Sequence, residues 1–192
     1  MRWTPIMGLR IIGGHLKGKR LHPVPGRMIR PTGSRQRESM FNILSHEVGD
    51  AGVLDLFAGT GVLGIEALSR GAKFAVFLDQ FKGAISVIKR YIRSCKLEEK
   101  TKTIRWNIRS GLSCLKTVPL EFDLVFMDPP YNRGDIRPAL ENLHKTGRLK
   151  VGSTIVIEHS SGEPISVAET DFSLIDQRRY GKTLVTFLDY MV

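Results

Sequence analysis

Residues 55–64, DLFAGTGVLG, decide the fold that the sequence predicts. Gly59, Gly61 and Gly64 match the pattern G-x-G-x-x-G, in which glycines allow a sharp turn and a close approach of the backbone to a ligand at a helix N-terminus. An acid that binds ribose hydroxyls is expected about twenty residues later, at the end of the next strand. Asp79 closes the apolar run FAVFLD at that distance. Together they predict a site for a nucleoside-containing cofactor. Because no G-K-[ST] follows the glycines, a phosphate-binding P-loop is excluded.

The segments around this loop alternate between buried strands and helices. We expect strands over 53–57, 74–79, 101–106, 122–128 and 153–159, helices over 63–70, 84–95 and 137–146, and an antiparallel pair over 173–191 that turns near Gly181. Such alternation predicts an α/β fold with a mostly parallel, doubly wound sheet covered on both faces and an antiparallel C-terminal strand pair. Upstream, a hairpin or extended loop is expected to turn at Gly13 and Gly14, and a helix is expected from Ser34.

The glycine loop leaves two cofactors open, because NAD and S-adenosylmethionine are both bound by this architecture. Asp55 lies inside the first strand, directly before the loop. A carboxylate there repels a pyrophosphate but suits the ammonium group of a methionine moiety, which favours S-adenosylmethionine. The alternative is that Asp55 caps the N–H groups of the loop itself.

The charge is concentrated at the N-terminus. The net charge is +10, and residues 1–40 hold nine of the 29 Lys and Arg residues with Glu38 as their only acid. Eight of the ten net positive charges therefore lie in this segment. A basic arm beside a nearly neutral body predicts a polyanionic partner, most often nucleic acid, with a solvated leader as the alternative.

No apolar run approaches the roughly 18 residues of a membrane span, and no signal-peptide pattern opens the chain. Cys95 and Cys114 lack metal-ligand spacing, so no metal site is predicted and both are interpreted as reduced thiols. These features predict a cytoplasmic protein without a membrane partner, and we expect a monomer.

A second motif, DPPY at residues 128–131, ends the predicted fourth strand. In a doubly wound sheet this strand end faces the same crevice as the glycine loop. The Asp128 carboxylate and the Pro129 carbonyl can accept the two N–H bonds of an exocyclic base amine and direct its lone pair toward a methyl donor. Pro129 and Pro130 stiffen the loop, and Tyr131 can stack on the base. The alternative is a proline-rich turn with a buried tyrosine.

DPPY resembles the catalytic motif of amino-directed S-adenosylmethionine methyltransferases. With RIIGGHLKGKRL, RPTGSRQRESMFNIL, VLDLFAGTGVLGIEALSRGA and IVIEH in this order, the chain resembles the bacterial 16S ribosomal RNA guanine-N2 methyltransferase family of RsmD type from about Arg10 to its C-terminus. The resemblance implies the Rossmann-like fold of class I methyltransferases, with 1–40 as an RNA-binding extension packed on a catalytic domain over 41–192.

The resemblance also implies roles for individual residues. The catalytic residues would be Asp128, Pro129, Pro130 and Tyr131. The cofactor-binding residues would be Asp55, Phe57, Ala58, Gly59, Thr60, Gly61, Asp79, Gln80, Asn107 and Ile108. The RNA-binding residues would be Arg10, Lys17, Lys19, Arg20, Arg30, Thr32, Arg35 and Arg37. The implied partner is 16S ribosomal RNA, either free or within an assembling small subunit.

Three other functions are weighed against this one. An adenine-N6 methyltransferase of DNA or RNA uses the same tetrapeptide, but the DNA enzymes usually carry a larger recognition domain. A non-catalytic nucleic-acid-binding protein would not need Asp128 or an intact glycine loop. An NAD oxidoreductase leaves both DPPY and the basic arm unexplained.

Overall fold

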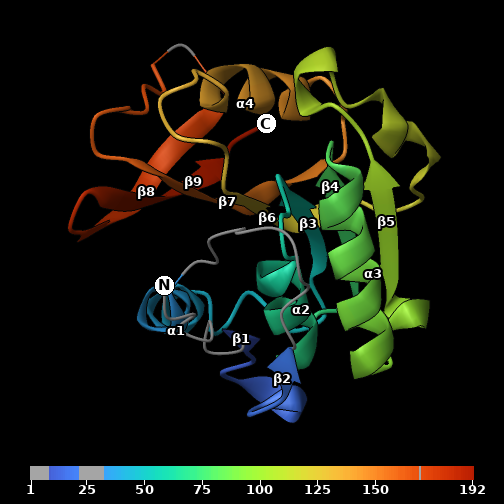
Figure 1. Cartoon of the computed structure of the whole chain (residues 1–192). Helices are drawn as coiled ribbons and strands as arrows, with labels where there is room; N and C mark the ends of the chain where they lie inside the picture. The colour runs from blue at the N-terminus through green and yellow to red at the C-terminus, as the bar shows by residue number, and fades with distance from the viewer. Residues whose placement is uncertain (1–8, 22–32, 169) are drawn as a thin grey trace, which may run out of the picture.

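A seven-stranded sheet forms the centre of the molecule (Figure 1). The computed structural model describes residues 9–21, 33–168 and 170–192. The strand order is β5-β4-β3-β6-β7-β9-β8. Neighbours from β5 to β7 are parallel, β9 is antiparallel to β7, and β8 is antiparallel to β9. The strands are Gly52–Leu56 (β3), Phe74–Asp79 (β4), Thr101–Arg105 (β5), Phe122–Met127 (β6), Leu149–Ser160 (β7), Phe172–Tyr180 (β8) and Thr183–Tyr190 (β9). The predicted sheet with its antiparallel C-terminal pair is confirmed.

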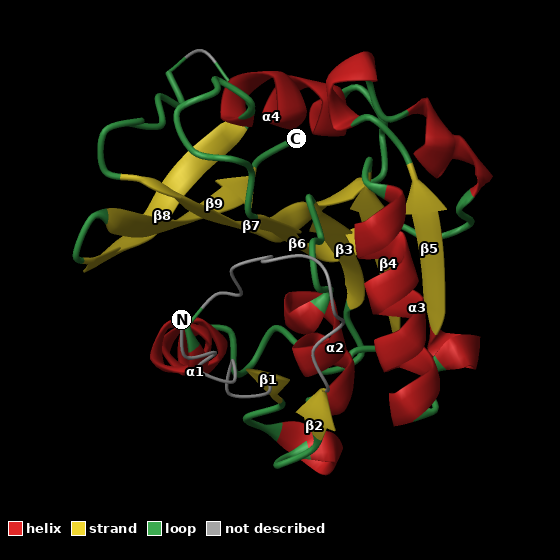
Figure 2. Ribbon diagram, viewed as in Figure 1, coloured by secondary structure: helices red, strands yellow, loops and turns green. Residues whose placement is uncertain are grey.

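Helices cover both faces of this sheet, with α2 and α3 on one side and α4 on the other (Figure 2). The α-helices are Ser34–Ile43 (α1), Val62–Ser69 (α2), Lys82–Cys95 (α3) and Ile136–His144 (α4). Short 3-10 helices at Glu98–Lys100, Ile108–Ser110 and Ser113–Thr117 were not predicted.

Successive residues of β3 point into two separate cores. Val53 packs in the cluster that contains Phe41 of α1 and Ile65 of α2. Leu54 packs in the cluster that contains Leu140 of α4. Because both faces of the sheet are buried, the strands are continuously apolar instead of alternating between apolar and polar residues.

Three predicted elements differ in detail from the structure. β7 begins at Leu149, four residues before the predicted start. α4 begins at Ile136, so Pro138 lies in its first turn, where a missing backbone N–H costs no intrahelical hydrogen bond. The N-terminal hairpin does not turn at Gly13 and Gly14: β1 (Leu9–Arg10) and β2 (Arg20–Leu21) pair across a longer connection that contains a 3-10 helix.

The N-terminal hairpin is attached to α2 through a buried carboxylate. Glu66 accepts hydrogen bonds from the backbone N–H groups of Ile12 at 2.9 Å and Gly13 at 2.7 Å. Arg37 of α1 lies 3.9 Å from the same carboxylate and donates to the carbonyl of Arg10 at 3.0 Å. Arg37 and Glu66 both have no exposed side-chain surface. Hairpin, α1 and α2 are therefore joined by one buried polar network.

The predicted boundary between residues 40 and 41 falls inside α1. The division of the chain into an arm and a main domain stays a prediction. In the described ranges, none of the helices has the length and apolar character that crossing a membrane requires.

Candidate active site

The glycine loop turns the chain from β3 into α2 through three residues with positive φ. Phe57 has φ 57°, Gly59 has φ 53°, and Gly61, the N-cap of α2, has φ 71°. A Cβ atom on Gly61 would lie 2.9 Å from Cγ1 of Ile88 in α3, so a larger residue is excluded by packing as well as by backbone conformation. This tight turn leaves Gly59 on the wall of a cavity.

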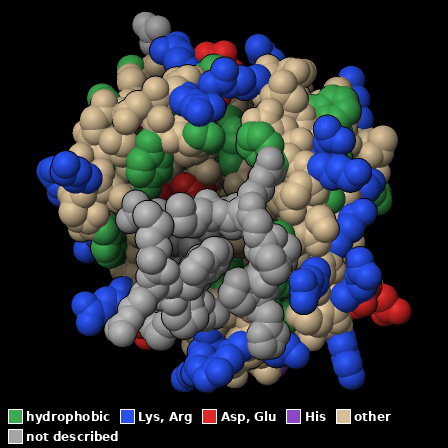
Figure 3. Space-filling view, viewed as in Figure 1, with side chains coloured by type: hydrophobic (Ala, Val, Ile, Leu, Met, Phe, Trp, Pro, Cys, Tyr) green, Lys and Arg blue, Asp and Glu red, His purple; other side chains and the backbone are tan. Residues whose placement is uncertain are grey.

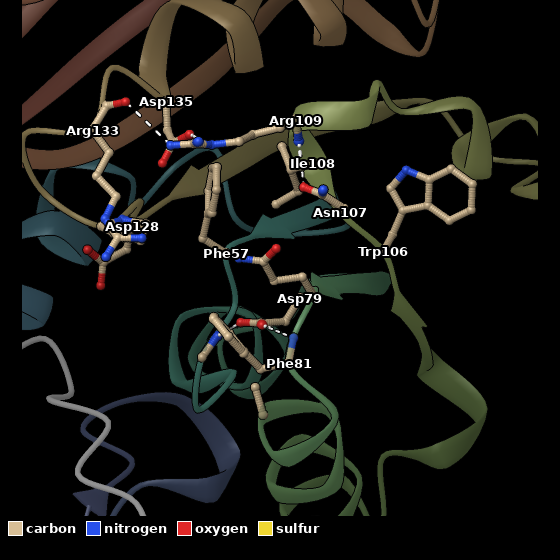
Figure 4. A pocket seen from close by; sticks show the side chains of 14 residues that line it. Phe57, Asp79, Phe81, Trp106, Asn107, Ile108, Arg109, Asp128, Arg133 and Asp135 are labelled. Atoms are coloured by element: carbon tan, nitrogen blue, oxygen red, sulfur yellow. Dashed lines mark hydrogen bonds and ion pairs between the residues drawn. The ribbon is translucent and has the colours of Figure 1, made fainter.

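Asp79, at the end of β4, holds the glycine loop in place. Its Oδ2 accepts a hydrogen bond from the N–H of Gly59 at 2.9 Å, and its Oδ1 accepts one from the N–H of Phe81 at 2.8 Å (Figure 4). An ionised carboxylate has about four acceptor positions, so each oxygen keeps the capacity for a further donor. Asp79 lines the cavity, where the ribose hydroxyls of a nucleoside would be such donors.

The cavity has a volume of about 590 Å³ and lies at the carboxyl ends of β3 to β6. Figure 4 shows side chains from these strand ends around one space. The predicted residues on its wall are Phe57, Gly59, Asp79, Gln80, Asn107, Ile108, Asp128 and Pro130. The structure thus brings six of the ten predicted cofactor residues and two residues of DPPY into one cavity.

Six further residues line this cavity and were not predicted. Phe81 lies two residues after the end of β4, and Trp106 directly follows β5, so their position at the ends of predicted strands was a signal for them. The others are Ala84, Arg109, Arg133 and Asp135. Trp106 is fixed by a hydrogen bond from its Nε1 to the carbonyl of Gly111 at 2.9 Å.

The other predicted cofactor residues do not line the cavity. Ala58, Thr60 and Gly61 belong to the loop but do not line the cavity. Asp55 is buried, and its Oδ2 accepts the N–H of Gly64 at 3.1 Å. Burial raises the pKa of Asp55 to about 8, the Gly64 N–H opposes the shift, and the charge of Asp79 adds to it. Asp55 therefore caps α2, which was the alternative interpretation, and its contact with a methionine ammonium stays a prediction.

Asp128 lies directly after β6, partly open to the cavity. Burial, then the charge of Glu158, then that of Asp55 raise the pKa of the Asp128 carboxyl well above its ordinary value. Pro129 is buried and does not line the cavity. The carboxyl ends of three neighbouring strands thus concentrate acidic groups, as expected for a site that holds N–H donors or a cation.

Tyr131 is 39% exposed, so the interpretation of a buried tyrosine in a turn is wrong. Its hydroxyl donates to Oε1 of Glu158 at 2.9 Å and lies 3.3 Å from Oγ1 of Thr183. Burial of part of the ring raises the pKa of Tyr131, and the neighbouring Glu158 adds to the shift. The hydroxyl is therefore anchored to β7 and β9, and Tyr131 does not line the cavity itself.

The loop after DPPY is held from two sides. Glu163, in the loop after β7, accepts the N–H groups of Asn132 at 2.6 Å and Gly134 at 2.9 Å. From the other side, Arg109 forms an ion pair with Asp135 and donates to the carbonyl of Arg133 at 3.4 Å (Figure 4). These contacts fix the loop at the entrance to the cavity without using Asp128 or Tyr131.

The predicted RNA-binding residues separate into three groups. Arg10, Lys17, Lys19, Arg20 and Arg35 are exposed. Arg30 and Thr32 lie outside the described residues. The assignment of Arg37 is wrong, because its side chain is fully buried against Glu66 and cannot contact RNA in this fold.

The space-filling view shows where charges lie on this face. Lys and Arg side chains surround a hollow in which acidic and hydrophobic side chains are visible (Figure 3). A basic rim around a partly acidic centre suits a polyanion that inserts one uncharged, donor-rich group.

The chain matches the protein family described as Conserved hypothetical protein 95 over residues 9–189. Ribosomal RNA small subunit methyltransferase D from Escherichia coli (strain K12) is 33% identical over 91% of this chain and 86% of that protein. The protein of the same name from Haemophilus influenzae is 33% identical over 90% of this chain and 89% of that one.

Solved structures agree with these matches. The structure of yhhF from Escherichia coli has a TM-score of 0.84 at 29% identity, covering 96% of this chain and 98% of that chain. SMU.776, solved in complex with SAH, shares the fold with a TM-score of 0.67 at 12% identity, covering 82% of this chain and 50% of that one. The predicted Rossmann-like class I methyltransferase fold is thereby confirmed. The chain belongs to the Conserved hypothetical protein 95 family, as its resemblance to the RsmD-type methyltransferases predicted.

Proposed function

We propose that the protein transfers a methyl group from S-adenosylmethionine to the exocyclic N2 amine of a guanine in 16S ribosomal RNA. One observation carries the proposal: a single cavity has Gly59 and Asp79 on its wall together with Asp128 and Pro130. A cofactor and an amine bound in one cavity would lie close enough for the transfer of a methyl group. The family members named for the small-subunit ribosomal RNA support the choice of substrate.

The cavity fits S-adenosylmethionine in size and lining. Its volume of about 590 Å³ lies within the roughly 300–1,000 Å³ of small-molecule sites. Asp79 would accept the ribose hydroxyls, and the backbone of Gly59 allows close approach. Asn107 and Ile108, with Trp106 beside them, would enclose the adenine. The bound cofactor supplies an electrophilic methyl group on its sulfonium sulfur.

Asp128 and the carbonyl of Pro129 would hold the target amine. The lone pair of an exocyclic amine is delocalised into the base, which makes the amine a weak nucleophile. Two acceptors that grip its two N–H bonds favour a pyramidal nitrogen and direct the lone pair at the methyl group. Transfer leaves an extra proton on the nitrogen. Burial and the nearby Glu158 raise the pKa of Asp128, which makes its ionised carboxylate a better acceptor for that proton.

The base would be captured between Tyr131 and the cavity. Tyr131 is partly exposed while its hydroxyl is fixed on Glu158, so its side chain would be positioned before the base arrives. Stacking on such an aromatic face is a common way to hold an unstacked base. Exposed Lys17, Lys19 and Arg35 would contact phosphates of the RNA.

Methylation of unmodified 16S RNA with isotopically labelled S-adenosylmethionine tests the proposal. The RNA is supplied free and in reconstituted small subunits, digested to nucleosides, and separated by chromatography with mass detection. We expect labelled N2-methylguanosine. Label in N6-methyladenosine would contradict the guanine assignment, and RNA binding without any transfer would contradict the enzymatic function.

Asp128→Ala separates the chemical step from binding. We expect its single-turnover rate to fall on the order of 10² or more, with RNA and cofactor affinities nearly unchanged, because a preorganised polar group acts mainly in the transition state. Glu99→Ala removes an exposed carboxylate beside the amino end of β5 and should keep the normal rate. A normal rate in Asp128→Ala would show that this carboxylate only caps its loop.

A further inference from the structure

Glu158 of β7 lies beside Asp128 at the carboxyl edge of the sheet. The last register pair of β6 and β7 is Met127 with Ile157, so Asp128 and Glu158 follow at the same level on neighbouring parallel strands. Side chains at the same level of neighbouring strands point to the same face. The influence of Glu158 on the titration of Asp128 agrees with this proximity. Two carboxylates therefore stand side by side where the proposed base amine is held.

The two oxygens of Glu158 have different surroundings. Oε1 accepts the hydroxyl of Tyr131 at 2.9 Å. Oε2 is buried and has no hydrogen-bond partner among the described residues. Only 8% of the surface of Glu158 is exposed, so water has little access to this oxygen. A buried acceptor without a donor carries a free-energy penalty, and one that persists beside a binding site calls for a donor from outside the chain. Nη1 of Arg37 also has no hydrogen-bond partner, but it lies 3.9 Å from the carboxylate of Glu66.

The amine edges of guanine and adenine differ in the atom next to the exocyclic nitrogen. In guanine, the N2 amine adjoins N1–H, so two neighbouring ring positions both donate. In adenine, the N6 amine adjoins N1, which carries a lone pair and no hydrogen. Two adjacent carboxylates match the guanine edge, whereas one of them would face a lone pair of adenine.

We propose that Glu158 accepts the N1–H of the target guanine while Asp128 holds its N2 amine, so that Glu158 selects guanine over adenine. This inference rests on the proposed function and adds to it a residue that determines base specificity. The base would enter between the ring of Tyr131 and Asp128, which brings its edge to the unpartnered Oε2. Because Glu158 belongs to β7 and Asp128 is the first residue after β6, the register of these two strands sets the spacing of the two carboxylates.

The test uses two RNA oligonucleotides that differ only at the methylated position, with guanine or 2-aminopurine. 2-Aminopurine keeps the amine at C2, but its N1 has a lone pair and no hydrogen. We expect the wild-type single-turnover rate to be about 10²-fold or more lower on 2-aminopurine, because a site built to bind an N–H rejects an analogue that lacks it. This comparison needs no variant, so it does not depend on whether a substituted protein folds.

The second part of the test uses the variant Glu158→Gln. Its amide can donate to the N1 of 2-aminopurine, and its carbonyl can still accept the hydroxyl of Tyr131. The preference for guanine should therefore shrink at least about tenfold or reverse. Tyr131→Phe is the matched control, since it breaks the same contact from the other side and leaves the carboxylate intact. It should slow both substrates by a similar factor and keep the guanine preference.

The outcomes separate the inference from the proposed function. Equal wild-type rates on the two bases would overturn the role of Glu158 alone, because transfer to guanine would still occur. Equal losses on both bases in Glu158→Gln and in Tyr131→Phe would show that Glu158 only positions Tyr131. Transfer to adenine instead of guanine by the wild-type protein would overturn both proposals.

Discussion

Gly64 of α2 lies directly against Phe77 of β4. A Cβ atom added to Gly64 would be 2.4 Å from Cε1 and 2.8 Å from Cζ of this ring, and 3.3 Å from Oδ2 of Asp55. The ring is fully buried and cannot move aside without displacing its neighbours. The third glycine of the motif therefore sets the distance between helix and sheet.

Gly64→Ala should lower the free energy of unfolding by about 1–3 kcal/mol, the usual cost of overpacking a dense core. Urea unfolding followed by circular dichroism measures it. Gly49→Ala is the matched control, because a Cβ atom at Gly49 meets nothing within 4 Å and should change stability by less than about 0.5 kcal/mol. Equal effects of the two substitutions would contradict this account of Gly64.

Asp55 should make stability depend on pH. Burial raises its pKa to about 8, compared with about 3.9 in an unfolded chain. Between these values the folded protein keeps a proton that the unfolded chain releases. Its contribution to stability is therefore complete below about pH 4 and is lost as the pH rises through about 8.

Asp55→Asn removes this titration while its amide oxygen can still accept the N–H of Gly64. Urea midpoints between pH 4.5 and 8.5 should show that the variant gains stability relative to the wild type as the pH rises. Asp128 titrates in the same direction and remains in both proteins, so a residual slope is expected. Parallel curves for wild type and variant would mean that Asp55 is ionised throughout.

Asp79→Ala should weaken the binding of S-adenosylmethionine roughly ten- to a hundredfold, in keeping with the ~1.5–3 kcal/mol of hydrogen bonds to a charged group. Titration calorimetry is the measurement. Asp79→Asn keeps one acceptor oxygen and should lose less. Melting temperatures without cofactor are needed as well, because Asp79 also holds the N–H groups of Gly59 and Phe81. Unchanged affinity in a folded Asp79→Ala protein would remove Asp79 from the cofactor site.

Exposed basic residues of the N-terminal segment should make RNA binding depend on salt. For each phosphate contact removed, the slope of log affinity against log salt should decrease by about 0.7 to 0.9. Lys17→Ala, Lys19→Ala and Arg35→Ala test this, since all three side chains are exposed. Lys145→Ala, just beyond α4, is the control and should leave the slope unchanged. If the three variants keep both slope and affinity, the segment is only a solvated leader.

Contacts between residues of the same β-α-β unit, which lie close together in the sequence, could be predicted. Gly59 and Asp79 are linked by the spacing of one β-α-β unit, and the structure shows them hydrogen-bonded. The contacts of Tyr131 with Glu158 and of Arg109 with Asp135 depend on which strands become neighbours, and alternation of strands and helices does not give that order. Because of the first contact, Tyr131→Phe should slow the reaction even though it keeps the aromatic ring.

Arg37 shows a signal that was present and misinterpreted. Its charge predicted an RNA contact, but it precedes Met40, Phe41 and Leu44 at the spacing of one helical face. All three of these side chains are buried. The periodicity therefore indicated burial, and what the sequence did not give was Glu66, the partner that makes such burial tolerable.

The buried carboxylate of Glu66 also limits how the N-terminal hairpin can be removed or recombined between related proteins. A chain that began after residue 40 would keep Glu66 inside α2 but would lose Arg37 and the backbone donors of Ile12 and Gly13. Arg70 would remain paired with Glu66 at 3.0 Å, but each lost donor to a buried charge typically costs about 1–3 kcal/mol, so the losses add up to a large share of the stability of a single domain. The N-terminal hairpin is therefore not a detachable module. Recombination between relatives can transplant it only together with α1 and an acid at the position of Glu66, so the hairpin and the core beneath it are inherited as one unit.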